Sequence, residues 1–208
     1  MITVVDYGLG NKRSVIKAFS VLGAEAESSS DPEKILSAEA IILPGVGAFG
    51  DGMKNLKEAG LIEPMTEAVL KNNTPFLGIC LGMQLVAKDS NELGDFQGLG
   101  WIDSVVRKFE FGPENSNLKI PHIGWNEAKM NPECPLFEGL GDSANFYFVH
   151  SYHMICNDKS VEVATTDYGY SFTSAVQKDN LFATQFHPEK SQKAGLAVLK
   201  NFLNYVRK

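Results

Sequence analysis

Cysteine is scarce in this chain, and the cysteines present form no disulfide framework. The three of them, Cys80, Cys134 and Cys156, are an odd number without paired spacing, which is typical of proteins in the reducing cytosol. No Cys-x-x-Cys pair and no mixed histidine–cysteine cluster indicates a bound metal. We therefore expect a cytoplasmic protein without a metal or other cofactor, in which Cys134 and Cys156 are structural or incidental.

Long apolar runs and dense clusters of positive charge are also missing. The longest apolar runs, such as those at residues 40–43 and 146–149, are far shorter than the roughly 20 residues of a membrane-spanning helix. The N-terminus has no basic region followed by an apolar segment and a cleavage site, so we expect no signal peptide. A net charge of −6 without a basic patch argues against nucleic acid as a partner. We expect neither a membrane nor a nucleic acid among the partners.

What the chain does have is the composition of an ordinary globular protein. Hydrophobic residues make up 44% and charged residues 21% of the 208 positions, enough to bury a sizeable core without disulfides. No repeat, low-complexity segment or linker divides the sequence. We therefore expect one domain over residues 1–208.

The first ninety residues alternate between short apolar runs and segments of helical periodicity. Expected strands are residues 2–5, 24–27, 40–43 and 75–79, and expected helices are residues 12–22, 53–57, 62–70 and 81–87. Strands separated by helices indicate βαβ units and a parallel sheet.

The middle of the chain changes to short β-type runs separated by turn residues. Expected strands there are residues 102–109, 120–125, 145–149, 161–165 and 174–177. A further strand at 181–186 and a helix at 192–206 close the chain. The pattern predicts an α/β fold: a mostly parallel sheet flanked by helices, with antiparallel strands appended.

The strand predicted at residues 75–79 leads directly into Cys80, which has Gly78 and Gly82 two residues to either side. This is the spacing of a nucleophile elbow, with sulfur in place of the usual serine oxygen. Glycines without Cβ atoms permit such a sharp strand-to-helix turn, and the N-terminus of the following helix favours a thiolate. The alternative is a buried cysteine between two packing glycines.

A second candidate group lies after the last predicted strand, where His187 and Glu189 flank Pro188. On an extended segment, residues two apart point to the same side, and proline biases the preceding residue toward that conformation. A carboxylate beside an imidazole holds it in one tautomer and stabilises the imidazolium. Cys80, His187 and Glu189 would then be nucleophile, base and orienting group. The alternative is a surface loop at a strand end.

The loop of residues 44–52 contains four glycines and follows another predicted strand. Such a loop turns backbone N–H groups toward a developing oxyanion. A phosphate cradle is the alternative, although the loop lacks the Walker pattern.

Together these pieces resemble the class I (triad) glutamine amidotransferases. The resemblance rests on residues 44–47, 78–84 and 187–189, and on further segments at 6–11, 121–126, 148–152 and 184–191. It extends over nearly the whole chain. It implies a flavodoxin-like sheet and the hydrolysis of L-glutamine to glutamate and ammonia.

The resemblance also assigns roles to individual residues. Cys80 would attack the glutamine side-chain amide, His187 would accept the thiol proton and pass it to ammonia, and Glu189 would orient His187. The implied oxyanion donors are the N–H groups of Leu81 and of the loop at Gly47, which is misaligned in the family until a partner binds. The implied substrate-binding residues are Gln84, Glu92, Ser151 and Tyr152.

The partner implied by the resemblance is a separate (β/α)₈ barrel synthase subunit that receives the ammonia, forming a heterodimer. Asn11, Trp125, Tyr147 and Lys190 would contact it. Each of these residues also has a purely structural alternative. Gln84 would cover a helix turn, Glu92 would be a solvated loop charge, and Trp125 and Tyr147 would be core aromatics. The remaining histidines, His122, His150 and His153, we expect to be structural rather than catalytic.

Three other functions are compatible with these residues. A homologous amidotransferase subunit would serve a synthase that amidates sugars. A stand-alone ester-cleaving cysteine hydrolase would need neither Gln84 nor Gly47. A stress sensor or chaperone built around an elbow cysteine would not need the His187–Glu189 pair.

Overall fold

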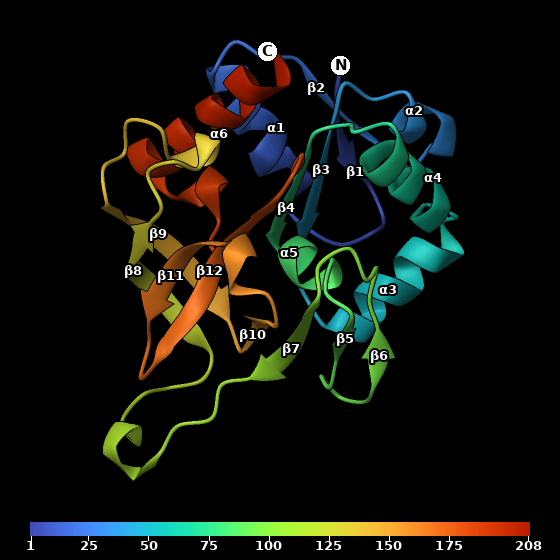
Figure 1. Cartoon of the computed structure of the whole chain (residues 1–208). Coiled ribbons are helices and arrows are strands. Elements are labelled where there is room, and N and C mark those ends of the chain that lie inside the picture. The colour runs from blue at the N-terminus through green and yellow to red at the C-terminus, as the bar shows by residue number, and fades with distance from the viewer.

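Five parallel strands form the centre of the computed structural model, which describes residues 1–208 (Figure 1). They are adjacent in the order β2-β1-β3-β4-β13, which is the flavodoxin-like order of a doubly wound sheet. Their bounds are Ile2–Val5 for β1, Ala26–Ser29 for β2, Ala40–Gly45 for β3, Phe76–Cys80 for β4 and Leu181–Thr184 for β13. The carboxyl ends of β3, β4 and β13 therefore meet at one edge of the sheet.

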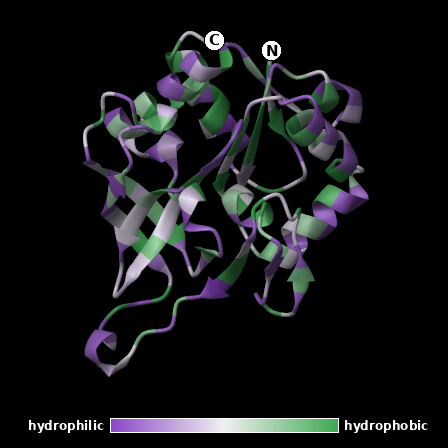
Figure 2. Cartoon of the chain, viewed as in Figure 1, coloured by the Kyte–Doolittle hydropathy of each residue, from purple (hydrophilic) through white to green (hydrophobic).

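Strands β1, β3, β4 and β13 are buried on both faces, which explains their nearly continuous apolar sequences. Along β3, Ile42 belongs to one apolar cluster, whereas its neighbours Ile41 and Leu43 belong to another. Figure 2 shows the same strands as hydrophobic, while the surrounding helices alternate between hydrophobic and hydrophilic residues. The sheet thus separates two hydrophobic cores.

Helices cover both faces of this sheet. Helices α1 (Lys12–Val21) and α6 (Gln192–Val206) pack on one face, where Phe19 and Phe202 are fully buried. The other face is covered by α2 (Pro32–Leu36), α3 (Phe49–Glu58), α4 (Ile62–Thr66), the π-helix Glu67–Lys71 and α5 (Leu81–Leu85).

Strands that pair antiparallel, apart from the parallel pair β5 (Asp89–Ser90) and β7 (Ser104–Lys108), extend the sheet beyond β13. From β12 (Ser171–Lys178), one path continues through β10 (Tyr152–Cys156), β7, β5 and β6 (Phe96–Gln97). The other path runs through β11 (Glu162–Asp167), β8 (His122–Met130) and β9 (Ser143–His150). Four 3₁₀ turns complete the structure, at Pro113–Asn115, Pro135–Phe137, Lys159–Val161 and Pro188–Lys190.

The predicted fold class is confirmed, and the bounds of β1 and α6 are as predicted. The strand predicted at 24–27 lies two residues later, because this polar edge strand has no apolar run to fix its position. Helix α3 begins four residues before the predicted 53, inside the glycine loop. The short elements α2, β5, β6 and β10 were missed, although Asp31 and Pro32 are a good helix-start signal.

None of the helices has both the length and the apolar character that a membrane crossing requires.

Candidate active site

Cys80 is the last residue of β4 and immediately precedes α5, at a sharp turn of the backbone. Its φ of 56° and ψ of −108° are strained for a residue with a side chain. A Cβ on Gly78 would lie 2.7 Å from the carbonyl oxygen of Gly82, and a Cβ on Gly82 would overlap the carbonyl oxygen of Leu43. Both glycines are therefore sterically required for the chain to turn at Cys80.

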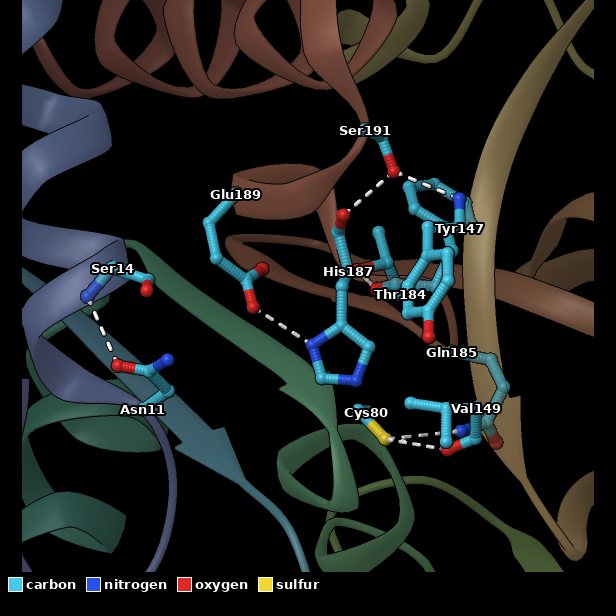
Figure 3. A network of polar contacts seen from close by, with 11 residues as sticks. Asn11, Ser14, Cys80, Tyr147, Val149, Thr184, Gln185, His187, Glu189 and Ser191 are labelled. Carbon is cyan, nitrogen blue, oxygen red and sulfur yellow. Dashed lines mark hydrogen bonds and ion pairs between the residues drawn. The ribbon is translucent and has the colours of Figure 1, made fainter. Parts of the chain in front are cut away.

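His187 follows β13, the strand adjacent and parallel to β4, and its ring lies over Cys80 (Figure 3). Its Nδ1–H donates to Glu189 Oε1 at 2.8 Å, because a carboxylate only accepts. The other ring nitrogen, Nε2, is buried without a hydrogen-bond partner. One correction applies: Glu189 lies in the 3₁₀ turn Pro188–Lys190 and not on an extended segment, yet this turn also brings the two side chains together.

The surroundings of His187 favour its protonated form. Burial by itself would lower the pKa of His187, but the Cys80 sulfur and the Glu189 carboxylate outweigh burial and raise that pKa to about 9. The other two cysteines are different, because burial raises the pKa of Cys134 to about 11 and that of Cys156 to about 12. These two thiols stay protonated and poorly nucleophilic at neutral pH.

Further polar groups surround the sulfur of Cys80. The Gln185 side-chain amide donates to Sγ at 3.7 Å, and the thiol is 3.9 Å from the carbonyl oxygen of Val149, to which it donates (Figure 3). Gln84 in turn donates to Gln185 Oε1 at 3.0 Å. Gln185 was missed from the sequence, although it precedes His187 by two residues on the same segment. That spacing was the signal available to find it.

Backbone hydrogen bonds fix the position of His187. Its N–H donates to the carbonyl oxygen of Tyr147 at 2.9 Å. The Ser191 hydroxyl donates to the carbonyl oxygen of His187 at 2.6 Å and accepts from the Tyr147 N–H at 2.9 Å (Figure 3). Ser191 is fully buried, so this bridge ties the histidine segment to β9. Its role also escaped the sequence interpretation, because it depends on a strand 44 residues away.

A cavity of about 280 Å³ opens beside Cys80. Its lining includes all six residues predicted to meet the oxyanion or the substrate: Gly47, Leu81, Gln84, Glu92, Ser151 and Tyr152. A volume near the lower limit for small-molecule sites suits a ligand of amino-acid size. A Cβ on Gly45 would lie 2.7 Å from Leu81 Cβ, so the glycine loop packs directly against the elbow.

Two cavity residues have well-defined contacts. Gln84 is buried, and its amide donates to the carbonyl oxygen of Tyr152 at 2.9 Å. Glu92 accepts from the N–H of Phe49 at 2.7 Å, at the start of α3, and burial raises the pKa of Glu92. The carboxylate therefore does not behave as a solvated loop charge, and it supplies the helix cap that α3 lacks in its own sequence.

The four residues predicted to face a partner are at or near the surface. Trp125 is 49% exposed and packs edge-on against Tyr147, with ring centroids 6.2 Å apart. The Lys190 ammonium lies 5.9 Å from the centroid of the Tyr147 ring. Asn11 is exposed and caps α1 by accepting from the Ser14 N–H at 3.2 Å. Trp125 is thus not a core aromatic, and Tyr147 is only half-buried.

No group of three or more histidine, cysteine, aspartate or glutamate side chains is arranged to hold a metal ion.

Comparison with known proteins gives near full-length matches. The family profile described as "Glutamine amidotransferase class-I" matches residues 3–206. The imidazole glycerol phosphate synthase subunit HisH of Geobacter sulfurreducens is 50% identical over 203 residues, which cover 97% of this chain and 97% of the relative. The subunit HisH 2 of Pseudomonas aeruginosa is 44% identical over 206 residues, covering 99% and 100%.

Solved structures share the fold at much lower identity. A crystal structure of a glutamine amidotransferase superposes with a TM-score of 0.77 at 20% identity, covering 100% of both chains. The structure of PurLQS from Thermotoga maritima has a TM-score of 0.75 at 21% identity, covering 98% of this chain and 97% of the other. With its family profile and its close relatives spanning almost every residue, the chain belongs to the class I glutamine amidotransferases.

Proposed function

We propose that this chain is the glutaminase subunit of an imidazole glycerol phosphate synthase. It hydrolyses L-glutamine to glutamate and ammonia and passes the ammonia to a (β/α)₈ barrel subunit, which makes imidazole glycerol phosphate and AICAR in histidine biosynthesis. The observation that carries the proposal is the meeting of Cys80, which lines an amino-acid-sized cavity, with the paired His187 and Glu189 (Figure 3). The relatives named HisH support the pathway.

In the first half-reaction, the Cys80 sulfur attacks the side-chain carbonyl carbon of glutamine and a C–S bond forms. The proton given up by the Cys80 thiol is carried by His187 Nε2, which has no other hydrogen-bond partner, in agreement with the raised pKa of His187. The carbonyl electron pair moves to oxygen, and the N–H groups of Leu81 and the Gly47 loop stabilise this oxyanion by donating hydrogen bonds to it. When the tetrahedral intermediate collapses, the C–N bond breaks and His187 gives its proton to the departing ammonia.

In the second half-reaction, water attacks the γ-glutamyl thioester while His187 takes a proton from it. The C–S bond then breaks, which releases glutamate and restores the pair of Cys80 and His187. Glu189 stays ionised throughout and stabilises the imidazolium through Nδ1.

Other residues that line the cavity provide groups that can bind the α-ammonium and α-carboxylate of the substrate. The Glu92 carboxylate makes no ion pair within the chain, so it is available to the α-ammonium group. Ser151 and Tyr152 line the same cavity, and their backbone N–H groups would suit the α-carboxylate. Gln84 holds this backbone in place through the Tyr152 carbonyl.

The partner surface lies beside the site. Trp125, Tyr147 and Lys190 form one cluster, and the Tyr147 ring is 6.5 Å from that of His187. A barrel subunit covering these residues and Asn11 would receive ammonia from the elbow before it reaches solvent. We expect the isolated chain to be nearly inactive, because oxyanion donors contribute about 3–4 kcal/mol only when they are aimed at the developing charge.

The test is reconstitution with the barrel subunit encoded by the same organism. Cys80→Ser should abolish glutamine-dependent synthesis and leave synthesis from ammonium salts intact. Loss of both activities would contradict the assignment. High turnover of small esters by the isolated chain would instead indicate a stand-alone hydrolase.

The acceptor of the ammonia needs a separate experiment. Several relatives have numbered names, such as HisH 1 in Campylobacter jejuni and HisH 2 in Pseudomonas aeruginosa. We expect this chain to restore growth without histidine to a bacterium that lacks its own glutaminase subunit, when it is supplied with its cognate barrel. Failure to complement, combined with normal glutaminase activity, would favour the sugar-amidating alternative.

A further inference from the structure

Two buried histidines that the proposed chemistry does not use lie opposite each other on neighbouring strands. His122 of β8 and His150 of β9 are direct cross-strand partners, and His122 Nδ1 is 3.1 Å from His150 Nε2. Both side chains are almost completely buried. His150 lines the cavity beside Cys80, so this pair connects the interior of the antiparallel extension to the site.

Hydrogen bonding fixes the tautomer of each ring. The carbonyl oxygen of Tyr152 only accepts, so His150 Nδ1 carries the proton that is donated to it at 2.8 Å. Neutral His150 then accepts at Nε2 from His122 Nδ1–H. His122 Nε2 is therefore an acceptor, and it accepts a hydrogen bond from the side-chain amide of Asn126 at 3.3 Å. All donations therefore run in one direction, from β8 to the backbone of Tyr152.

This arrangement requires both rings to be neutral, and their surroundings keep them so. Burial lowers the pKa of His122 to about 4 and that of His150 to about 3. The ionisable groups acting on His150 are His122, His153 and His187, which all disfavour a positive charge there. The His122 ring also stacks on Tyr168 with centroids 3.9 Å apart. At neutral pH the pair is thus an uncharged structural link.

The hydrogen bonds through His122 and His150 end on the backbone of residues that line the cavity. The carbonyl oxygen of Tyr152 accepts from both His150 and Gln84, and the carbonyl oxygen of Val149 accepts from the Cys80 thiol. Residues 149–152 all line the cavity. The position of this short segment therefore depends on His150 from one side and on Gln84 from the other.

We propose that His122 and His150 are a positioning pair that holds the backbone of residues 149–152 where it receives the amino-acid end of glutamine. This rests on the proposed glutaminase function and adds to it a determinant of substrate affinity. The hydrogen bonds of the Cys80 sulfur go to Val149 and Gln185 and not to this pair, so loss of the pair acts on KM for glutamine more than on kcat.

The experiment compares variants in the reconstituted complex. His122→Phe keeps a ring against Tyr168 but removes the donor to His150, and KM should rise roughly 10- to 100-fold, the range expected when one buried hydrogen bond is lost. The kcat should change less than KM. His122→Asn places an amide nitrogen near the former Nδ1 and should restore most of the affinity.

His153 provides the matched control. It is as buried as His150, but its ring nitrogens contact the carbonyl oxygen of Met154 and the hydroxyl of Tyr170, neither of which lines the cavity. We expect His153→Phe to leave KM for glutamine unchanged. An equal rise of KM in His122→Phe and His153→Phe would overturn the positioning role, as would an unchanged KM in His122→Phe.

A second measurement does not depend on turnover. Hydrogen exchange of the backbone amides over residues 149–152 should be faster in His122→Phe than in the wild type and in His153→Phe. Equal exchange rates in the wild type and in both variants would refute the positioning role of the pair, even if the wild type proved inactive on glutamine. Conversely, a wild-type complex that releases no glutamate would refute the proposed function alone.

Discussion

The substitution Glu189→Gln isolates the contribution of one charge to the candidate triad. The carboxylate accepts from His187 Nδ1–H at 2.8 Å, and both side chains are at most 3% exposed. Glutamine has nearly the same shape and its carbonyl oxygen still accepts from Nδ1–H, so the ring orientation is retained while the charge is lost. Removing an adjacent opposite charge typically shifts a pKa by about 1–3 units, or about 1.4–4 kcal/mol.

The sign of the change follows from the direction of the His187 shift. With Glu189 present, the pKa of His187 is about 9, so the imidazolium that protonates ammonia is lost only as the pH rises through about 9. In the variant, this alkaline limb of kcat/KM should move down by about 1–3 units. At pH 7 a pKa of about 6–8 would leave roughly 10–90% of His187 protonated, so the rate should fall by up to about 10-fold.

The free energy of unfolding provides an independent test of how the Glu189 charge acts on His187. Because its folded-state pKa is raised, His187 stabilises the protein fully below about pH 6.5, and this contribution is lost as the pH rises through about 9. The difference in free energy of unfolding between wild type and Glu189→Gln should therefore be largest near pH 6 and shrink above pH 9.

The assay is a pH–rate profile of glutamate release by the reconstituted complex, with urea unfolding at pH 6 and 9.5. Asp103→Asn is the control, because it removes a carboxylate that pairs with Lys88 on the exposed surface, 2.8 Å away. An alkaline limb at the same pH in Glu189→Gln and wild type would refute the electrostatic role assigned to Glu189.

Three further outcomes are expected. Gly82→Ala should lower the free energy of unfolding by about 1–3 kcal/mol or more in a urea titration, because its Cβ would overlap the backbone carbonyl of Leu43; unchanged stability would contradict the steric argument. At pH 7.5, iodoacetamide should label the elbow cysteine and spare Cys134 and Cys156, whose pKa values burial raises, and peptide mapping that finds either one labelled first would contradict this. Trp125→Ala should weaken barrel binding by about 2 kcal/mol or more in calorimetry with little loss of stability, since the ring is half exposed; unchanged affinity would place the partner elsewhere.

The parallel half of the fold was predictable because its information is local. Residues 2–5, 40–43 and 75–79 are compact apolar runs, and the helices between them have clear periodicity. Cys80 with its two glycines, and His187 with Glu189, are short motifs at strand ends. In a parallel sheet, the carboxyl ends of adjacent strands lie side by side. Because β4 and β13 are neighbours, Cys80 and His187 come close together.

What escaped the sequence depends on contacts between distant residues. The start of α3 depends on Glu92, which caps it from 43 residues away. Gln185 reaches the sulfur of Cys80 only through the β4–β13 pairing, 105 residues apart in the chain. The pairing of His122 with His150 likewise requires the register of β8 and β9. No local pattern contains that information, because strand register between distant segments is set by the whole sheet.

The most direct test of the central claim is chemical trapping of the sulfur. An electrophilic glutamine analogue should alkylate Cys80 stoichiometrically when the barrel subunit is present, as read by intact mass and peptide mapping, and L-glutamine should protect against it. If Cys80 stays unmodified under those conditions, or if the label is found on another residue, this chain does not cleave glutamine through that thiol.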